Sequence, residues 1–327
     1  MNKNLIGIPG TDLEVSSICL GTGSLGSTIP PQDAFDLLDE YLALGGNFID
    51  TAKIYADWLP GETSISEKTI GRWMKLRRNR SRVILGTKGA HPELSTMHIG
   101  RLSPQEINSD LEASLQNLGT DYIDLYWLHR DDPARPVEEI IETLNTAIRA
   151  GKIRYIGCSN WTTARIRQAN QYAGQHGLRG FVANQMFWNL AKLNPPGIQD
   201  KTIVWMDGEM YAFHRETKMA AVPYSSQAGG WFQKKQQGNN KRIHPAMREL
   251  YDSAENEARL QHALQLGALF KLSLTQVVLG YLLSQPFPTI PIVGCQSIAQ
   301  LRDSMSAWDV RLPEDQVRFL VGEDPFA

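Results

Sequence analysis

The sequence has few cysteines and no long apolar run. Its three cysteines, Cys19, Cys158 and Cys295, lie far apart among 327 residues and form no CxxC pair. An odd number of scattered cysteines is typical of a reducing compartment rather than of a disulfide framework. No segment approaches the roughly 18 consecutive apolar residues of a membrane-spanning helix, and the first ten residues lack the apolar core of a secretion signal. We therefore expect a cytoplasmic protein with no membrane partner.

The sequence also lacks an excess of charge of either sign. Lysine and arginine together number 33 and aspartate and glutamate 35, which gives a formal net charge of −2. Such a balance creates no strong field that would attract nucleic acid or an anionic membrane, so the partner we expect is a small molecule. With 42% hydrophobic residues and no low-complexity linker, we expect one folded domain over residues 1–327.

Short β-rich apolar runs alternate with amphipathic helical stretches along the chain. Strands that alternate with helices pair in parallel, and eight right-handed crossovers close into a barrel. The sequence therefore predicts an α/β fold of the (β/α)8 TIM-barrel type. The eight predicted strands are SICLG (ending at Gly21), NFIDT, VILGTKG, YIDLYWLH (ending at His129), IRYIGCSN, GFVANQM, MAAVPYSS and TIPIVG (ending at Gly294).

Start and stop signals support the helices between these strands. SPQEINSDLEASLQNLG begins with a Ser-Pro pair and ends at Gly119, and VEEIIETLNTAIRAG ends at Gly151. The first residues, IGIPGTDLEVSS, predict a β-hairpin at the bottom of the barrel. Long connections over residues 187–218 and 225–272 are expected to form loops at the C-terminal face, and 313–321 a helix on the outside.

Chemically active residues recur where the predicted strands end. The carboxyl ends of the strands of such a barrel face one mouth, where Asp50, Lys88 and His129 should meet Tyr55, just past the second strand. Addition of hydride to a carbonyl creates an alkoxide that needs an acid. Tyr55 is the candidate acid, because a nearby ammonium, that of Lys88, lowers the pKa of a phenol. Asp50 would hold Lys88, and His129 would orient the carbonyl.

These residues lie in sequence blocks that resemble those of the aldo-keto reductase family: LGTG, FIDTAKIY, GTKG, YIDLYWLH, RYIGCSN, ANQ and GCQSIAQLRDS. The resemblance covers nearly the whole chain. It implies a (β/α)8 barrel that binds NAD(P)H without a Rossmann domain and interconverts an aldehyde or ketone with an alcohol. It also implies Asp50, Tyr55, Lys88 and His129 as the catalytic set.

The same resemblance implies the cofactor-binding residues. Ser159, Asn160 and Gln185 would hold the carboxamide, and Tyr224 would stack on the nicotinamide ring. The loop from Gly294 to Ser304 would hold the adenosine end. The full set of expected cofactor contacts is Gly21, Thr22, Asp50, Ser159, Asn160, Gln185, Tyr224, Ser225, Gln227, Gly294, Gln296, Gln300, Asp303 and Ser304.

Two segments depart from the family pattern. Relatives continue the seventh strand as Tyr-Ser-Pro-Leu, whereas this chain has residues 224–227 as Tyr-Ser-Ser-Gln. Many members place a basic residue on the 2′-phosphate of NADP, but this loop offers Gln296 and Gln300 with only Arg302 nearby. NADP(H) is favoured by the family pattern, and NAD(H) is the alternative.

The substrate is expected to be a small carbonyl compound or alcohol. Tyr55 and His129 would contact it, with Trp58, Arg130 and Trp188 completing the pocket. Trp58, Trp161, Trp188 and Trp231 all follow predicted strands, where packing in the core is an equal alternative to lining a pocket.

Three other interpretations were weighed. Residues 21–26 match the GxGxxG dinucleotide fingerprint, but Pro30 and Pro31 interrupt the helix that must follow it. His91, His98 and His129 could be ligands of a metal-dependent hydrolase, although converging strand ends here carry Lys, Asn, Gln and Tyr instead. The third interpretation is a redox-sensing subunit that binds the cofactor without catalysis. The presence of all four candidate catalytic residues disfavours it.

Overall fold

Eight parallel strands form the centre of the molecule. The computed structural model describes residues 5–322. The strands pair in parallel in the order β10-β3-β4-β5-β6-β7-β8-β9. They span β3 Cys19–Gly21, β4 Phe48–Asp50, β5 Ile84–Gly89, β6 Ile123–Leu128, β7 Ile153–Ser159, β8 Phe181–Gln185, β9 Ala220–Ala221 and β10 Ile292–Gly294. All eight strands predicted from the sequence are present, and the predicted fold class is confirmed.

Hydrogen bonds between the first and last edges close the sheet. Ala221 forms a parallel bridge with Thr289, just before β10. The backbone N–H groups of Ile290 and Ile292 donate to the carbonyl oxygens of Ala221 and Pro223, both at 2.9 Å. Because β9 is thereby joined to the β10 segment, the carboxyl ends of all eight strands share one mouth.

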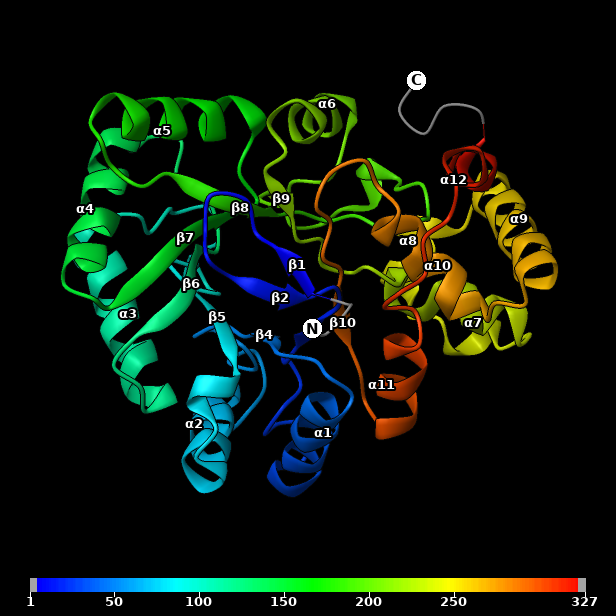
Figure 1. Cartoon of the computed structure of the whole chain (residues 1–327), viewed down its shortest axis with the longest axis horizontal. Coiled ribbons are helices and arrows are strands. Elements are labelled where there is room, and N and C mark those ends of the chain that lie inside the picture. Colours follow the sequence, from blue (N-terminus) through cyan, green and yellow to red (C-terminus); the bar gives the residue numbers. More distant parts are fainter. Residues whose placement is uncertain (1–4, 323–327) are drawn as a thin grey trace.

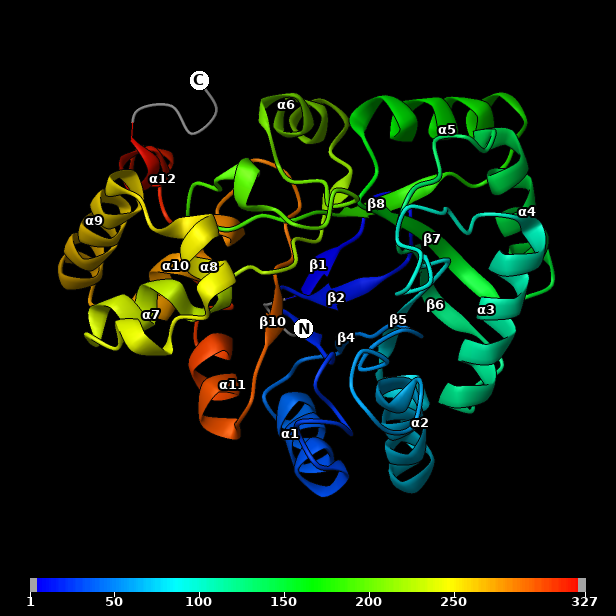
Figure 2. The ribbon, with the colours of Figure 1, turned by 180° about the vertical axis from the view of Figure 1, so that it is seen from behind.

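The helices surround the strands, as Figures 1 and 2 show from opposite sides. Those that alternate with strands are α1 Pro31–Ala43, α2 Ile65–Arg77, α3 Pro104–Leu118, α4 Val137–Arg149, α5 Thr163–Gln175, α6 Gly208–Thr217, α10 Leu274–Leu283 and α11 Ile298–Met305. The additional helices are α7 Trp231–Gln236, α8 Pro245–Tyr251, α9 Ala254–Phe270 and α12 Glu314–Val321, which gather on one side of the barrel.

The predicted helix boundaries are confirmed. Ser103 caps α3 through a capping box with Glu106, Pro104 stands at its first position, and Gly119 ends it with a φ of 60°. Helix α4 ends at Arg149, and Gly151, two residues later, takes a φ of 74°. These signals involve only residues that are close together in the sequence, which is why the sequence revealed them.

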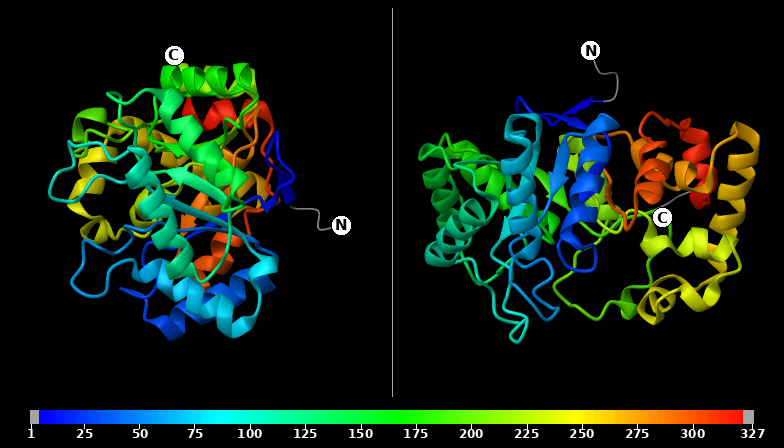
Figure 3. Two further views of the ribbon diagram at one scale, coloured as in Figure 1. Left: turned by 90° about the vertical axis from the view of Figure 1, so that its left-hand side faces the viewer. Right: turned by 90° about the horizontal axis from the view of Figure 1, so that it is seen from below.

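The N-terminal hairpin closes the end of the barrel opposite the mouth. Strands β1 Leu5–Gly7 and β2 Glu14–Ser16 pair antiparallel. Ile8, Leu13 and Val15 are at most 1% exposed and belong to one apolar cluster with Phe48 and Trp127 of the barrel. Figure 3 shows the hairpin at one end and the long loops at the other. The predicted hairpin and its position are therefore confirmed.

The two long connections are more helical than the sequence indicated. The first contains α6, and the second contains α7, α8 and α9. Apolar side chains from both connections, including Met210, Trp231 and Tyr251, are buried in a second core cluster with α10. Burial of these side chains stabilises the added helices on one flank of the barrel.

Within residues 5–322, no single helix is long and apolar enough to cross a membrane. Helices α9 and α10 meet that criterion of length and composition only when taken together, and they are bent by 99° at their junction.

Two glycines make room for the indole ring of Trp127 inside the barrel. A Cβ atom on Gly157 would lie 2.3 Å from the Trp127 ring, and one on Gly86 would lie 2.9 Å from its Nε1. Gly157→Ala should therefore lower the free energy of unfolding by about 1–3 kcal/mol, the usual cost of overpacking. Urea unfolding monitored by circular dichroism measures it.

Gly174→Ala is the matched control. A Cβ atom on Gly174, near the end of α5, meets no atom within 4 Å. In that helical position alanine should be neutral or stabilising by about 0.5–1 kcal/mol. Equal stabilities of the two variants would contradict the packing described for Trp127.

Candidate active site

The ammonium group of Lys88 lies at the centre of the mouth. Its Nζ donates to Oδ2 of Asp50 at 2.5 Å, to the hydroxyl of Tyr55 at 2.9 Å and to the carbonyl oxygen of Thr51 at 2.8 Å. Lys88 is 2% exposed and Asp50 is fully buried. All three ammonium protons therefore have hydrogen-bond partners, as a charge buried away from water requires.

Neighbouring parallel strands bring these residues together. Asp50 ends β4 and pairs with Gly86, two residues before Lys88 on β5. The chain then turns after β4, where the N–H of Lys53 donates to the carbonyl oxygen of Lys88 at 3.0 Å. That turn places Tyr55 over the Lys88 ammonium, which lies 4.6 Å from the centre of the tyrosine ring.

The pKa of Tyr55 differs in direction from the sequence expectation. Burial raises the pKa of this phenol, the positive charge of Lys88 lowers it, and the carboxylate of Asp50 raises it again, with a net rise. The expected influence of Lys88 is present, but desolvation outweighs it. Tyr55 is thus a neutral phenol at neutral pH whose ionised form has an ammonium beside it.

Lys88 and Asp50 form a buried ion pair. Burial by itself lowers the pKa of Lys88, but Asp50 and Tyr55 together hold it above its ordinary value. Burial raises the pKa of Asp50 above its ordinary value, although Lys88 and Gln185 oppose this rise. The side-chain amide of Gln185 donates to Oδ1 of Asp50 at 2.8 Å. Gln185, expected as a cofactor contact, therefore also supports the carboxylate.

His129 lies beside Tyr55 at the end of β6. Its backbone N–H donates to the carbonyl oxygen of Gly89, and its ring centre lies 5.9 Å from that of Tyr55 in an edge-to-face arrangement. Burial and the positive charge of Arg130 lower the pKa of His129 well below its ordinary value. Nδ1 of the ring is buried and has no hydrogen-bond partner in the described chain. The ring is therefore neutral, able to donate a hydrogen bond from one nitrogen only.

A second histidine, His91, faces the first. Its ring centre lies 4.7 Å from that of His129, at an interplanar angle of 67°. In the sequence, His91 was a candidate only as a metal ligand, together with His98 and His129. His98 is exposed in the following loop, and residues 5–322 contain no group of three or more His, Cys, Asp or Glu side chains able to hold a metal ion. The position of His91 three residues after Lys88 was the available signal for its place in the site.

Two of the expected substrate-pocket residues, Trp58 and Arg130, differ in their exposure and their contacts. Trp58 is 54% exposed and meets Tyr55 edge to face, with ring centres 6.3 Å apart. Arg130 donates to Asp200 at 3.1 Å and to Thr202 at 2.7 Å, which ties the end of β6 to the loop after β8. Sequence reasoning missed this pairing, because Asp200 lies 70 residues further along the chain.

Trp188, expected in the substrate pocket, lies among buried aromatic rings. This side chain is 5% exposed and packs against Tyr211 of α6, Tyr281 of α10 and Phe287. It belongs to the buried apolar cluster that also contains Met210 and Tyr281. Trp161 and Trp231 are likewise fully buried.

A cleft of about 340 Å³ extends from Tyr55 along the mouth. None of its lining side chains is charged. Expected cofactor residues from three separated segments line it, namely Gly21, Thr22, Ser225, Gln227, Gly294 and Gln296. The structure therefore brings these six together with Tyr55, as the sequence analysis expected.

Three further expected cofactor residues form one network beside His129. The side-chain amide of Asn160 donates to Oγ of Ser159 at 3.0 Å and to the carbonyl oxygen of His129 at 3.2 Å. Its Oδ1 accepts from the hydroxyl of Tyr224 at 2.6 Å. Asn160 takes a φ of 60°, which aims its side chain across the ends of β7 and β9.

The far end of the cleft is built from polar side chains that bond to one another. Gln300 accepts from the N–H of Gln296 at 2.7 Å, and Gln227 donates to Ser304 at 2.8 Å. Asp303 is exposed on α11. Arg302, the nearby cation, is paired with Glu40 of α1 at 2.7 Å.

The GxGxxG stretch does not run directly into a helix. Helix α1 begins only at Pro31, five residues after Gly26. A Cβ atom on Gly26 would lie 2.2 Å from Oγ1 of Thr69 on α2. This glycine therefore allows close approach of the loop to a helix.

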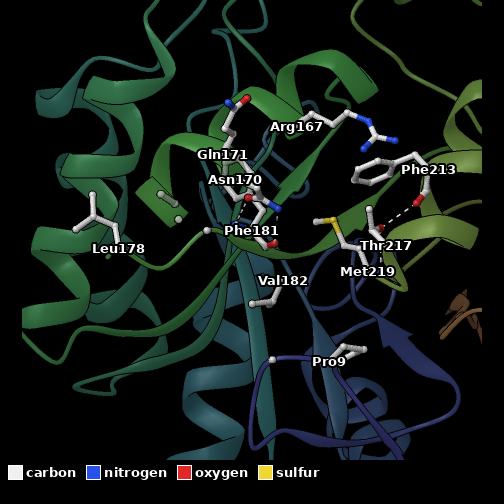
Figure 4. A pocket seen from close by; sticks show the side chains of 14 residues that line it. Pro9, Arg167, Asn170, Gln171, Leu178, Phe181, Val182, Phe213, Thr217 and Met219 are labelled. Atoms are coloured by element: carbon white, nitrogen blue, oxygen red, sulfur yellow. Dashed lines mark hydrogen bonds between the residues drawn. The ribbon is translucent and has the colours of Figure 1, made fainter. Parts of the chain in front are cut away.

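Another hollow, of about 670 Å³, lies at the opposite end of the strands between α5 and α6 (Figure 4). Arg167 and Phe213 project over it, with the guanidinium 4.9 Å from the centre of the ring. No residue of the expected site lines it.

Comparison with known proteins identifies relatives of the whole barrel. The model of the aldo/keto reductase family matches residues 17–321. The chain is 32% identical to a Bacillus subtilis protein named uncharacterized oxidoreductase YrpG, covering 95% of this chain and 92% of the relative. It is 30% identical to an aryl-alcohol dehydrogenase [NADP(+)] of Phanerodontia chrysosporium, covering 97% and 85%. It is 28% identical to norsolorinic acid reductase B of Dothistroma septosporum, covering 97% and 80%.

Burial of His91 should make stability depend on pH. Burial and the charge of Arg130 lower its pKa to about 4. Below the unfolded value of about 6.5 the unfolded chain binds a proton that the folded chain does not, so stability falls as the pH decreases from about 6.5 to 4. Between pH 7 and pH 5, the free energy of unfolding of His91→Gln should fall by about 1–2 kcal/mol less than that of the wild type.

Urea unfolding at the two pH values measures the difference. His98→Gln, at the exposed histidine of the same loop, is the control and should follow the wild type. A His91→Gln variant with the wild-type pH dependence would show that the imidazole is not shielded as described.

Proposed function

The chain belongs to the aldo/keto reductase family, and we propose that it transfers a hydride between a nicotinamide cofactor and an aldehyde, ketone or alcohol, with Tyr55 as the proton donor or acceptor. The observation that carries this proposal is the contact of the Lys88 ammonium with both Asp50 and the Tyr55 hydroxyl inside the mouth of the barrel.

The protein groups supply the proton and stabilise charge. When bound, the reduced nicotinamide supplies the hydride that converts a carbonyl to an alkoxide. Tyr55 keeps its proton at neutral pH, because burial raises the pKa of the phenol. It gives up that proton when the substrate oxygen becomes strongly basic. Lys88 then stabilises the phenolate at 2.9 Å, and Asp50 keeps the ammonium charged and in place.

Neutral His129 is proposed to orient the carbonyl. Its low pKa makes it a hydrogen-bond donor rather than a cation, so it polarises the oxygen without competing with Tyr55 for the proton. In the direction of alcohol oxidation, the Tyr55 phenolate accepts the proton instead.

The cleft beside Tyr55 fits a dinucleotide in its position and its donors. Hydroxyl and amide side chains from the segments after β3, β9 and β10 line it, with no carboxylate to repel phosphate. Ser159, Asn160, Gln185 and Tyr224 would hold the nicotinamide end, and Gln296, Gln300, Asp303 and Ser304 the adenosine end.

We infer a preference for NADP(H), with NAD(H) as the alternative. The support is the aryl-alcohol dehydrogenase relative, whose name specifies NADP(+). The preference should be modest, because the basic side chain nearest the adenosine end, Arg302, is already paired with Glu40.

Removal of the Tyr55 hydroxyl should abolish turnover. Tyr55→Phe deletes the proton donor but leaves the ring that lines the cleft, so kcat should fall by at least about 10²-fold while the Kd for reduced cofactor changes little. Steady-state absorbance of the reduced nicotinamide and fluorescence titration measure the two quantities. Tyr172→Phe, on α5 away from the mouth, is the control, and an unchanged kcat in Tyr55→Phe would refute the assignment of the acid.

The ratio of kcat/KM for NADPH to that for NADH should exceed one but stay modest. Gln296→Lys should raise this ratio several-fold by adding a cation near the expected 2′-phosphate, because a charged partner strengthens a hydrogen bond to phosphate. Lys75→Gln, in the last turn of α2 and outside the cleft lining, changes a cation elsewhere and should leave the ratio unchanged. A strong wild-type preference for NADH would contradict the inferred cofactor.

A further inference from the structure

A set of hydrogen bonds fixes the backbone around His91. Ala90, just before it, takes a φ of 59°, a left-handed conformation that is uncommon for residues other than glycine. The N–H of Ala90 donates to Asp110 at 2.8 Å, and the carbonyl oxygen of His91 accepts from Arg101 at 2.9 Å. Strained backbone that is held by such partners is concentrated at functional sites.

The protonation of the His91 ring follows from its contacts. Nδ1 lies 2.7 Å from the carbonyl oxygen of Pro92, which can only accept, so Nδ1 carries the proton. Burial lowers the pKa of the ring to about 4, so it is neutral at neutral pH. Nε2 is therefore an acceptor only, and no group within residues 5–322 donates a hydrogen bond to it.

The nearby charged group does not supply that missing donor. Arg130 directs its guanidinium to Thr202, Asp200 and the carbonyl oxygen of His129. Its positive charge influences His91 without a direct bond.

The free acceptor lies next to the groups proposed to act on the carbonyl. The ring centres of His91 and His129 are 4.7 Å apart, and that of His129 is 5.9 Å from Tyr55. The reacting carbonyl oxygen is itself an acceptor and cannot bond to Nε2 of His91. The group that does so must be a donor on a neighbouring atom of the substrate.

We propose that His91 is a specificity residue whose Nε2 accepts a hydrogen bond from a hydroxyl group on the carbon next to the reacting carbonyl. The preferred substrates are then α-hydroxy aldehydes and ketones, and the products are vicinal diols. This inference rests on the proposed carbonyl reduction and specifies the class of substrate for the same site.

Three aldehydes of nearly the same size test the proposal on the purified full-length protein with NADPH and with NADH. Glycolaldehyde carries the hydroxyl, propanal replaces it with a methyl group, and methoxyacetaldehyde keeps the oxygen but loses the donor. The wild type should show a kcat/KM for glycolaldehyde about tenfold or more above the values for the other two, since the analogues would cover the acceptor without offering it a donor.

Variants of His91 assign this preference to the ring. His91→Phe keeps a flat side chain without an acceptor, and it should bring the glycolaldehyde-to-propanal ratio down about tenfold, mainly through a higher KM for glycolaldehyde. The kcat/KM for propanal should stay within about threefold of wild type. His91→Gln retains an acceptor and should restore part of the ratio. His98→Phe, in the exposed part of the loop, should change neither value. Hydration of the aldehydes cancels when a ratio is compared between proteins on the same solutions, and the wild-type values are expressed per concentration of free aldehyde.

The outcomes separate the two proposals. An unchanged ratio in His91→Phe, or equal values for glycolaldehyde and methoxyacetaldehyde in the wild type, would overturn the role of His91 while leaving carbonyl reduction intact. If His91→Phe does not fold, the partial retention expected of His91→Gln and the wild-type comparison of the three aldehydes still decide the question. If the wild type reduces none of the three aldehydes with either cofactor, the proposed function itself is contradicted.

Discussion

The burial of one ion pair, Lys88 with Asp50, is the constraint on which the mouth of the barrel depends. An ammonium and a carboxylate withdrawn from water are stable only when every remaining donor and acceptor is satisfied. Thr51, Tyr55 and Gln185 meet that requirement here. Thr51 and Tyr55 lie in the segment between β4 and α2, and Gln185 ends β8. The ion pair therefore also fixes how these segments meet. A structure that stabilises the pair therefore positions Tyr55 at the same time.

The closed barrel keeps water away from this pair on the side opposite the mouth. Trp127 fills the interior, with space provided by Gly86 and Gly157, and the N-terminal hairpin seals the far end with apolar side chains. At the mouth itself, burial raises the pKa of Tyr55 in spite of the neighbouring ammonium. The same packing that stabilises the fold thus sets the proton affinity of the candidate acid.

Around the pair, the polar groups of the mouth are neutral or paired. His91 and His129 have lowered pKa values, and Arg130 is matched by Asp200. Such a site offers a ligand hydrogen bonds rather than net charge. Selection among carbonyl compounds then depends on where donors and acceptors lie on the substrate, which is the property assigned to His91.

The sequence by itself determined the eight strands, the helix caps and the adjacency of the four candidate catalytic residues. These features depend on local chemistry: alternation of strands with helices, a Ser-Pro start at Ser103, and polar residues at strand ends that parallel pairing must bring together. Tertiary structure alone decided the packing partners of Trp188, the helices within the second long connection, the pairing of Arg130 with Asp200 and the net shift of the Tyr55 pKa. It also decided that His91 faces His129. Each of these depends on which side chains from distant segments pack together and how much water they exclude, and a sequence pattern carries no measure of either.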